Sequence, residues 1–285
     1  MRSRWHRPDN GDAWIMGVLN CTPDSFSDGG NHVGAQAAVK HGMAMWEQGA
    51  ALIDVGGEST RPGAKPVSLE DELARVIPVV RGLVQAGAVV SVDTIKSEVM
   101  RQSVQAGAIM VNDVSALRHD ADSLQIVAES GADVCLMHMQ GTPETMQEKP
   151  QYEDVLAEVM AFFEARIEAC ISVGVAASSI VLDPGIGFGK RLEDNLALIL
   201  GVEVIKNHFG MPVLLGASRK SFLGELTGSP VEDREIETAA AHAIGIVRGA
   251  DMVRVHDVVQ QSHAVHVASA LASSLATHGL HMRAS

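Results

Sequence analysis

The chain has 285 residues, of which 46% are hydrophobic and 20% are charged, and its formal net charge is −13 at pH 7. These proportions indicate a well-cored globular protein, and the acidic balance argues against nucleic acid or an anionic membrane as a general partner. No stretch approaches the roughly 18 uncharged apolar residues of a membrane-spanning helix. Cys21, Cys135 and Cys170 form no CxxC pair, which predicts free thiols in a reducing compartment and hence a cytoplasmic protein.

The N-terminus only briefly imitates an export signal. The basic stretch "MRSRWHR" is separated by "PDNGD" from an apolar run that covers only residues 14–19, and Asn20 makes a poor cleavage site. We therefore predict a short, disordered lead-in over residues 1–13, followed directly by the first strand.

From residue 14 to residue 278 a single pattern recurs: a short apolar run, a polar or Gly-rich break, and a stretch with helical periodicity. The apolar runs predict strands over 14–20, 51–58, 89–94, 109–114, 134–139, 180–185, 213–218 and 252–257. Spacing of apolar residues by three and four predicts helices over 35–49, 69–86, 95–106, 153–173, 192–207 and 236–248.

Alternating strands and helices imply parallel strand pairing through right-handed crossovers. Eight such units fit an α/β fold of the (β/α)8 TIM-barrel type, which we predict as a single domain over 14–278 with a C-terminal tail over 279–285. An open doubly wound sheet is the alternative. No linker or shift of composition indicates a second domain.

A barrel of this type places its active site at the C-terminal ends of the strands. Polar side chains stand at or just beyond all eight predicted ends: Asn20; Asp54, Glu58 and Thr60; Asp93; Asn112 and Asp113; His138; Asp183; Arg219 and Lys220; Arg254 and His256. One such residue is often a helix N-cap. Eight of eight strands ending in this way predict a ligand site.

The last predicted strand, "DMVRVHD", carries two cations in an otherwise apolar run. Since a strand alternates its faces, Arg254 and His256 point the same way, into the interior, where a cation needs an anion beside it. These two residues and Asn20 can gather around phosphate oxygens.

A second group suits a flat ligand. Asp93, Asn112 and Asp183 offer a hydrogen-bonding edge for a heterocycle with adjacent N–H and amino donors, and Lys220 can bond a ring carbonyl or ring nitrogen. Arg254 can stack its guanidinium on an aromatic face. Together the two groups predict a heterocycle that carries a phosphate-bearing arm.

Two loops follow the first two strands, "CTPDSFSDGG" (21–30) and "GGESTRPGAKP" (56–66). Their composition predicts shaped, mobile loops that exclude water and bring Arg61 to an anion, and ordinary surface loops are the alternative. The Gly-rich stretch "GIGFGK" (185–190) lacks the spacing of a phosphate-binding loop and of a dinucleotide fingerprint. His138 can equally be a core histidine, and Met137 can line an apolar wall.

Eight segments, taken together, resemble the dihydropteroate synthase family. They are "MGVLNCTPDSFSDGG", "ALIDVGGESTRPGA", "SVDT", "VNDV", "MHMQGTPETMQ", "LDPGIGFGK", "LLGASRKSFLG" and "VRVHDV". The resemblance runs in register from about residue 14 to residue 270. Departures are small: Cys21 stands where Val is usual, and Ile186 stands where Phe is usual.

The resemblance implies a transferase of folate biosynthesis that is a sulfonamide target. The reaction joins 6-hydroxymethyl-7,8-dihydropterin diphosphate to p-aminobenzoate, with Mg²⁺ assisting, and gives 7,8-dihydropteroate and diphosphate. It proceeds through ionisation at the pterin methylene and needs no covalent enzyme intermediate. The resemblance also implies a homodimer, for which the C-terminal helix over 262–277 is a candidate face.

The family's site residues carry over by motif. The pterin pocket is expected to comprise Asp93, Asn112, Met137, Asp183, Gly216, Lys220 and Arg254. The p-aminobenzoate slot is expected to comprise Thr60, Arg61, Pro62, Phe188 and Ser221, and the diphosphate site Asn20, Thr60, Arg61, Arg254 and His256. Asn20 is the expected Mg²⁺ ligand, and Asp54, Arg61, Asp93 and Lys220 are the expected catalytic residues.

Two other functions share this fold. A pterin-dependent methyltransferase barrel would have the same Asp and Asn pocket but no need for "TPDSFSDGG" or "STRPG", which are intact here. A catalytically silent pterin-binding paralogue would be expected to have lost a loop residue or "SRKS", and none is lost.

Overall fold

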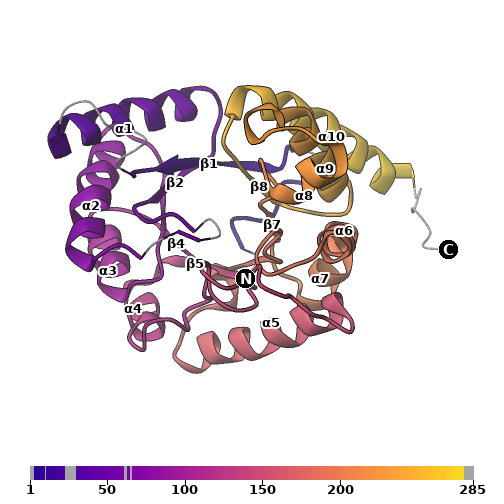
Figure 1. Ribbon diagram of the computed structural model, residues 1–285, viewed down its shortest axis with the longest axis horizontal. Helices are drawn as coiled ribbons and strands as arrows, with labels where there is room; N and C mark the ends of the chain where they lie inside the picture. Colours follow the sequence, from indigo (N-terminus) through magenta and orange to yellow (C-terminus); the bar gives the residue numbers. More distant parts are fainter. Residues whose placement is uncertain (1–2, 10, 23–29, 61–62, 65, 279–285) are drawn as a thin grey trace.

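The computed structural model describes residues 3–9, 11–22, 30–60, 63–64 and 66–278, with the backbone alone for 30–33. A ring of helices surrounds a ring of strands (Figure 1). The strands are β1 (Trp14–Asn20), β2 (Leu52–Gly56), β3 (Val90–Asp93), β4 (Met110–Asp113), β5 (Asp133–Met137), β6 (Ile180–Asp183), β7 (Leu214–Leu215) and β8 (Met252–Val255).

The strands pair in parallel in the order β6-β5-β4-β3-β2-β1-β8-β7. The two ends of this order meet at a parallel bridge between Leu182 and Val213, which closes the sheet on itself. The predicted (β/α)8 barrel is therefore confirmed, and the alternative of an open doubly wound sheet is wrong.

The helices are α1 (Gly30–Glu47), α2 (Leu69–Gln85), α3 (Ser97–Gln105), α4 (Ser123–Ser130), α5 (Val155–Ser172), α6 (Leu192–Leu200), α7 (Val202–Phe209), α8 (Ser221–Thr227), α9 (Glu235–Val247) and α10 (Val258–His278). The single helix predicted over 192–207 is two helices that meet at Gly201. The sequence predicted no bounds for the short helices α4 and α8, because eight or seven residues show too few turns for a clear period. Among the described residues no helix is long and apolar enough to cross a bilayer.

The main apolar core lies between the strands and the surrounding helices, and a second cluster fills the barrel itself. The second cluster comprises Trp5, Met16, Leu52, Met110, Cys135, Val181, Leu214 and Met252. Since side chains of a strand alternate, the residue two positions further along each strand faces inward one layer higher. This upper layer carries the polar residues, so the barrel has an apolar floor beneath a polar site.

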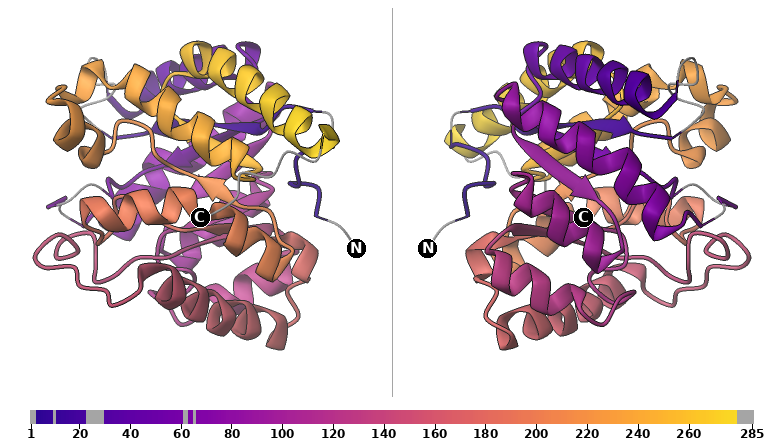
Figure 2. Two further views of the ribbon diagram at one scale, coloured as in Figure 1. Left: turned by 90° about the vertical axis from the view of Figure 1, so that its right-hand side faces the viewer. Right: turned by 90° about the vertical axis from the view of Figure 1, so that its left-hand side faces the viewer.

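The N-terminal segment closes the barrel at the end away from that site. The Trp5 side chain is 5% exposed, its Nε1 donates to Asp133 Oδ2 at 2.8 Å, and its ring meets that of Trp14 edge to face. Figure 2 shows the segment across one end of the barrel, opposite the long loops. The predicted disorder of residues 1–13 is therefore wrong for its described part, because Trp5 completes the apolar floor.

Candidate active site

Polar residues from separate strands converge at the C-terminal mouth of the barrel. Asp54 on β2, Asp93 on β3, Asn112 on β4 and Asp183 on β6 are all buried. The strand register explains why these residues lie at similar heights along the barrel axis. Asp93 pairs with Asn112, and Asp54 pairs with Ser91, two residues before Asp93. Buried carboxylates in this number require partners, and Arg254 from β8 is the main one.

The Arg254 guanidinium bridges two of these carboxylates. Its Nε donates to Asp54 Oδ2 at 2.7 Å, and its Nη2 donates to Asp93 Oδ2 at 2.7 Å. Asn112 Nδ2 donates to the same Asp54 oxygen at 2.8 Å. The sequence predicted an anion beside Arg254. In the protein without ligand, that anion is the pair of carboxylates of Asp54 and Asp93.

The other carboxylate oxygen of Asp54 is available to accept a hydrogen bond from a ligand. Asp54 Oδ1 is buried and has no hydrogen-bond partner among the described residues. A buried acceptor without a donor is costly. A ligand that presents N–H groups to the mouth would remove that penalty.

Burial also sets the protonation of the site. It raises the pKa of Asp93 to about 7, against the attraction of Arg254, which lowers it. Burial likewise raises the pKa of Asp183, while the Gly185 N–H and Lys220 oppose the shift. For Arg254, burial disfavours the charged form, but the Asp54 and Asp93 carboxylates outweigh it and the pKa rises. The mouth thus contains a permanent cation beside Asp93, whose carboxyl has a pKa of about 7.

An aromatic wall bounds one side of the site. The Phe188 ring is 8% exposed and belongs to an apolar cluster with Val114, Met137, Met139 and Met146. Lys220 Nζ lies 3.9 Å from the ring centroid, within the range of a cation–π contact. The structure thus brings together the predicted Met137, Phe188 and Lys220.

Gly216 borders the site between β6 and β8. A Cβ placed on it would lie 3.8 Å from Asp183 Oδ2 and 3.9 Å from Arg254 Cβ. Gly216 therefore lies beside two predicted pterin residues, and its missing side chain leaves room there.

The turn after β7 separates two cations that the sequence placed together. Arg219 has φ +57° and donates from Nε to Glu235 Oε1 at 2.5 Å and from its backbone N to Thr238 Oγ1 at 3.1 Å. Arg234 Nη1 bonds the carbonyls of Arg219 and Lys220, both at 3.3 Å. Arg219 therefore ties the turn to the helix layer, while Lys220 reaches Phe188.

Two further candidates make structural contacts. Asp113 accepts from the backbone N–H groups of Ser115 at 2.6 Å and Leu117 at 2.9 Å, so it shapes the turn after β4. Glu58 forms an ion pair with Lys96 at the start of α3. Neither contact is part of the carboxylate group around Arg254.

Sequence reasoning missed the group that holds His256. The Ser218 hydroxyl and His256 Nδ1 are 2.9 Å apart, and the His256 N–H donates to Ser218 Oγ at 3.3 Å. A serine at the end of a predicted strand was the available signal. Ser221, the next hydroxyl along, is exposed at the first position of α8.

Comparisons with known proteins agree with this geometry. The family model described as "Pterin binding enzyme" matches residues 16–256. The chain is 48% identical to dihydropteroate synthase of Escherichia coli (strain K12) over 261 residues, which cover 91% of this chain and 92% of the relative. The chain belongs to the dihydropteroate synthase family. The predicted family and the predicted class of enzyme, a transferase, are confirmed.

Solved structures of this family superpose closely. A crystal structure of Yersinia pestis dihydropteroate synthase with a sulfonamide drug complex has a TM-score of 0.88 and 43% identity, covering 96% of this chain and 99% of that chain. Xanthomonas albilineans dihydropteroate synthase with 4-aminobenzoic acid has a TM-score of 0.85 and 46% identity, covering 94% of each chain. These relatives give no support to the methyltransferase alternative.

The loop residues of this family member are only partly described. Thr60 is half-buried beyond β2. Arg61 and Pro62, predicted to bind the anion and the aryl amine, lie outside the described residues, as do residues 23–29 of the first loop.

The donors present suit a Mg²⁺ ion that a substrate helps to hold. Within the described part of the chain no three His, Cys, Asp or Glu side chains form a metal-binding group. Asn20, half-buried at the end of β1, offers an amide oxygen. Mg²⁺ is commonly held by one or two protein oxygens together with substrate phosphates and water. Asn20 therefore offers one protein oxygen to such an ion, and the other ligands would have to come from a substrate and water.

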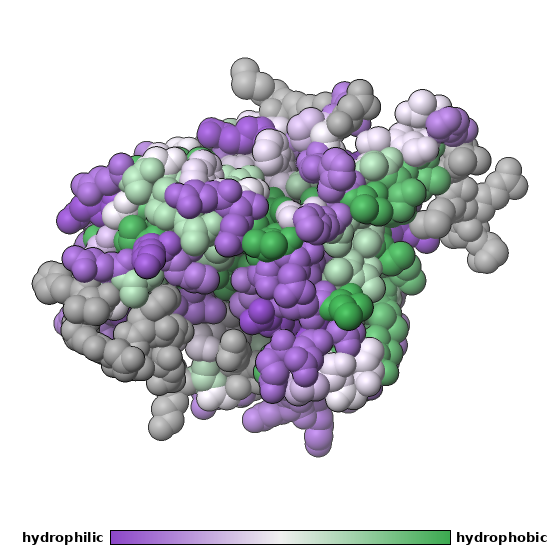
Figure 3. All heavy atoms as spheres, turned by 90° about the horizontal axis from the view of Figure 1, so that it is seen from above, coloured by the Kyte–Doolittle hydropathy of each residue, from purple (hydrophilic) through white to green (hydrophobic). Residues whose placement is uncertain are grey.

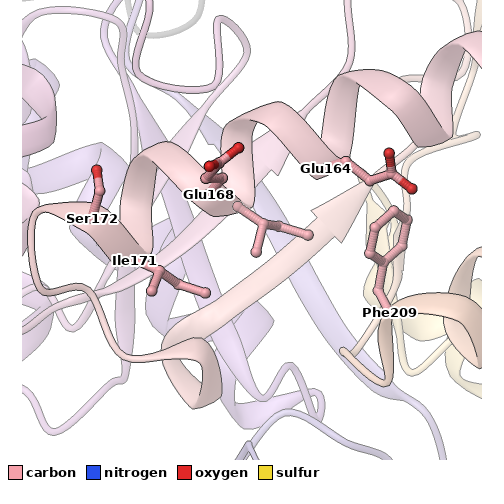
Figure 4. A pocket seen from close by; sticks show the side chains of 6 residues that line it. Glu164, Glu168, Ile171, Ser172 and Phe209 are labelled. Carbon is pink, nitrogen blue, oxygen red and sulfur yellow. The ribbon is translucent and has the colours of Figure 1, made fainter.

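One cavity lies away from the strand ends. It has a volume of about 480 Å³ and is lined by Glu164, Ile167, Glu168, Ile171, Ser172 and Phe209, between α5 and α7 (Figure 4). Its two glutamates would repel a diphosphate. It is therefore no candidate for the transfer reaction.

Proposed function

We propose that this chain condenses 6-hydroxymethyl-7,8-dihydropterin diphosphate with p-aminobenzoate, giving 7,8-dihydropteroate and diphosphate. The observation that carries the proposal is the buried group of Asp54, Asp93, Asn112 and Arg254 at the barrel mouth of a family member. The aryl amine is proposed because the Xanthomonas relative binds 4-aminobenzoic acid.

The pterin ring is proposed to lie in the mouth, with its N–H and amino groups toward the carboxylates. Asp183 and Asp93 accept from this edge, and Asn112 can donate and accept. Lys220 bonds the ring carbonyl or ring nitrogen, and Gly216 leaves space for the ring. Arg254 lies against the ring face, with Met137 in the adjoining wall.

The transfer step breaks the bond between the pterin methylene carbon and the diphosphate oxygen. The electron pair leaves with diphosphate, and the methylene cation is delocalised into the ring, where Asp93 and Asp54 favour it electrostatically. The aryl amine then bonds to this carbon and loses a proton. Arg254 has five N–H donors, so it can hold two carboxylates and still donate to diphosphate.

The remaining predicted roles complete the proposal. Asn20, Thr60, Arg61 and His256 bind diphosphate, with Mg²⁺ on Asn20. The ion, when bound, supplies charge neutralisation for the leaving group. The p-aminobenzoate slot is formed by Thr60, Arg61, Pro62, Phe188 and Ser221. A sulfonamide is expected to compete for this slot, since the Yersinia relative binds such a drug.

The deciding experiment measures diphosphate release from the purified protein with the pterin diphosphate and Mg²⁺, with and without p-aminobenzoate. Release that depends on p-aminobenzoate and matches dihydropteroate formation supports the synthase. Tight pterin diphosphate binding without product would instead support the silent paralogue.

The C-terminal helices are proposed as the face of a homodimer. Ile236 and Ile244 on α9 and Val259, Val267 and Leu271 on α10 are all exposed, Ile236 by 82%. Figure 3 shows apolar residues gathered over these helices. Such rows are unusual on a monomer surface. Sedimentation of wild type and Leu271→Glu tests this: a dimer that the substitution dissociates supports it, and a wild-type monomer contradicts it.

A cytoplasmic location is proposed from the cysteines. Cys21, Cys135 and Cys170 are free and buried, as predicted. Burial raises the pKa of Cys21 to about 12 and that of Cys170 to about 11, so both remain thiols at neutral pH. Fractionation of the source cells tests the location directly.

A further inference from the structure

The Gly-rich stretch "GIGFGK" (185–190) allows two backbone segments to pack closely and is not a phosphate-binding loop. Gly185 has φ +70°, and a Cβ on it would lie 1.9 Å from the His138 carbonyl oxygen. Gly189 has φ +63°, and a Cβ on it would lie 2.5 Å from the Gln140 carbonyl oxygen. The loop after β6 thus presses its backbone directly against the segment after β5.

Lys190 joins these two segments at their contact. Its side chain is 3% exposed, and its Nζ donates to the carbonyls of His138 at 3.2 Å and Phe188 at 3.1 Å. His138 Nδ1 lies 3.0 Å from the same Nζ. Three acceptors therefore surround the three hydrogens of an ammonium group.

The protonation of both partners fits this arrangement. Burial, with help from the Lys190 charge, lowers the pKa of His138 to about 3, so its ring is neutral and Nδ1 can accept. Burial lowers the pKa of Lys190 to about 7, against the attraction of Asp183. The three acceptors thus stabilise the charged form of Lys190, which burial disfavours.

The peptide that Lys190 holds carries the aromatic wall of the site. The Phe188 ring packs with Met137 and Met139 and lies beneath the Lys220 ammonium. No strand hydrogen bond holds Phe188, since β6 ends at Asp183. Its position therefore depends on the packing of its ring and on two hydrogen bonds of its backbone, one from its N–H to the Gly185 carbonyl at 3.0 Å and one from Lys190 to its own carbonyl.

The hydrogen bonds of Asp183 do not involve Lys190, although the Lys190 charge attracts the Asp183 carboxylate. Asp183 is the last residue of β6, its carbonyl accepts from the His138 N–H at 3.0 Å, and its Oδ1 accepts from the Gly185 N–H at 2.7 Å. Loss of the Lys190 ammonium would therefore move the aromatic wall before it moved the carboxylate.

We propose that Lys190 is a positioning residue for the transfer reaction, which acts through the Phe188 peptide to shape the slot for the aryl amine. The inference rests on the proposed function, because it assigns the effect to one of its two substrates. Lys190 is 3% exposed and its ammonium faces three acceptors of the protein, so the role we assign to it involves no contact with substrate. Its removal is expected to weaken aryl-amine use and to spare pterin binding.

The test compares Lys190→Met, which keeps the length of the chain and removes the three donors, with wild type. We expect KM for p-aminobenzoate to rise by about tenfold or more, the dissociation constant of the pterin to stay within about twofold, and kcat to change less than KM. Lys206→Met is the matched control, because Lys206, like Lys190, donates to a backbone carbonyl. Its acceptors, Gly249 O and Asp251 Oδ1, lie away from the mouth. A purely structural loss would lower stability in both variants without raising KM.

A double-variant cycle identifies the route of the effect. If Lys190 acts through Phe188, then Lys190→Met causes no further rise of KM in a Phe188→Ala background. If Lys190→Met does not fold, Lys190→Leu, which also removes the three donors, replaces it. An unchanged KM in the folded variant, or an equal loss of pterin affinity, overturns this inference and leaves the proposed function intact. A wild-type protein that makes no dihydropteroate overturns the proposed function itself.

Discussion

Replacement of Arg254 by methionine tests the electrostatic basis of the site. The substitution removes the donors at 2.7 Å from Asp54 and Asp93 and leaves both carboxylates buried. Removing one partner of a buried ion pair typically costs about 3–5 kcal/mol. Asn112 still donates to Asp54, and Arg254 itself is 20% exposed, so we expect the lower end, about 3 kcal/mol at about pH 8.

The loss of stability in Arg254→Met should depend on pH, because Asp93 titrates. With Arg254 present, the pKa of Asp93 is raised by burial to about 7, and the Arg254 charge is what limits the rise. With this pKa the Asp93 carboxyl is already mostly neutral at about pH 5.5, and the further rise in Arg254→Met keeps it neutral there, so its share of the penalty is absent at that pH. The loss of stability should therefore shrink to roughly half on going from about pH 8 to about pH 5.5.

Urea unfolding followed by circular dichroism at both pH values measures the effect. Arg101→Met is the control, because the Arg101 pair with Glu98 lies at the surface, with side chains 47% and 33% exposed, and should contribute less than about 1 kcal/mol at either pH. Adding Asp54→Asn to Arg254→Met should restore part of the lost stability. An equal loss at both pH values, or a loss no larger than that of the control, would refute the account of Arg254 as a counter-ion for buried carboxylates.

Three further predictions concern the floor and the ligand. Trp5→Ala should lower the free energy of unfolding by about 3–5 kcal/mol in urea titrations, with no change in KM, since Trp5 lies at the far end of the barrel. By calorimetry, Lys220→Ala and Asp183→Asn should each weaken pterin binding by about tenfold or more, whereas Arg61→Ala should lower turnover and spare free-pterin affinity; equal affinity losses in all three would contradict this division. Since the pKa of Asp93 is about 7 and the ionised form accepts from the pterin, affinity should fall as the pH drops below 7, and a flat profile would exclude this role.

Much of the fold could be read from local pattern. The strand over Trp14–Asn20 begins and ends where its apolar run does, and the other predicted strands overlap observed ones within a few residues. Errors arose where a local signal was short or was overruled by packing. The break at Gly201 interrupts an otherwise continuous apolar period, and Trp5 looked like part of a polar leader until the barrel floor placed it.

The candidate site divides in a similar way. Position along the strands predicted that Asp93, Asn112, Asp183 and Arg254 share the barrel mouth, because parallel strands all end on one side. Position along the strands could not predict which polar side chains point away from the barrel mouth. Asp113 bonds its own turn, since the neighbouring inward position on β4 belongs to Asn112.

The sequence by itself determined the order of strands and helices, the family, and the level at which polar residues enter the barrel, because periodicity and strand ends are local properties. Only the tertiary structure decided which groups neutralise one another. Arg254 and Asp54 are 200 residues apart in the chain, and Lys190 and His138 are 52 apart. Each pair meets only when strands from separate parts of the chain assemble side by side, and burial then removes water and makes an unpaired charge costly.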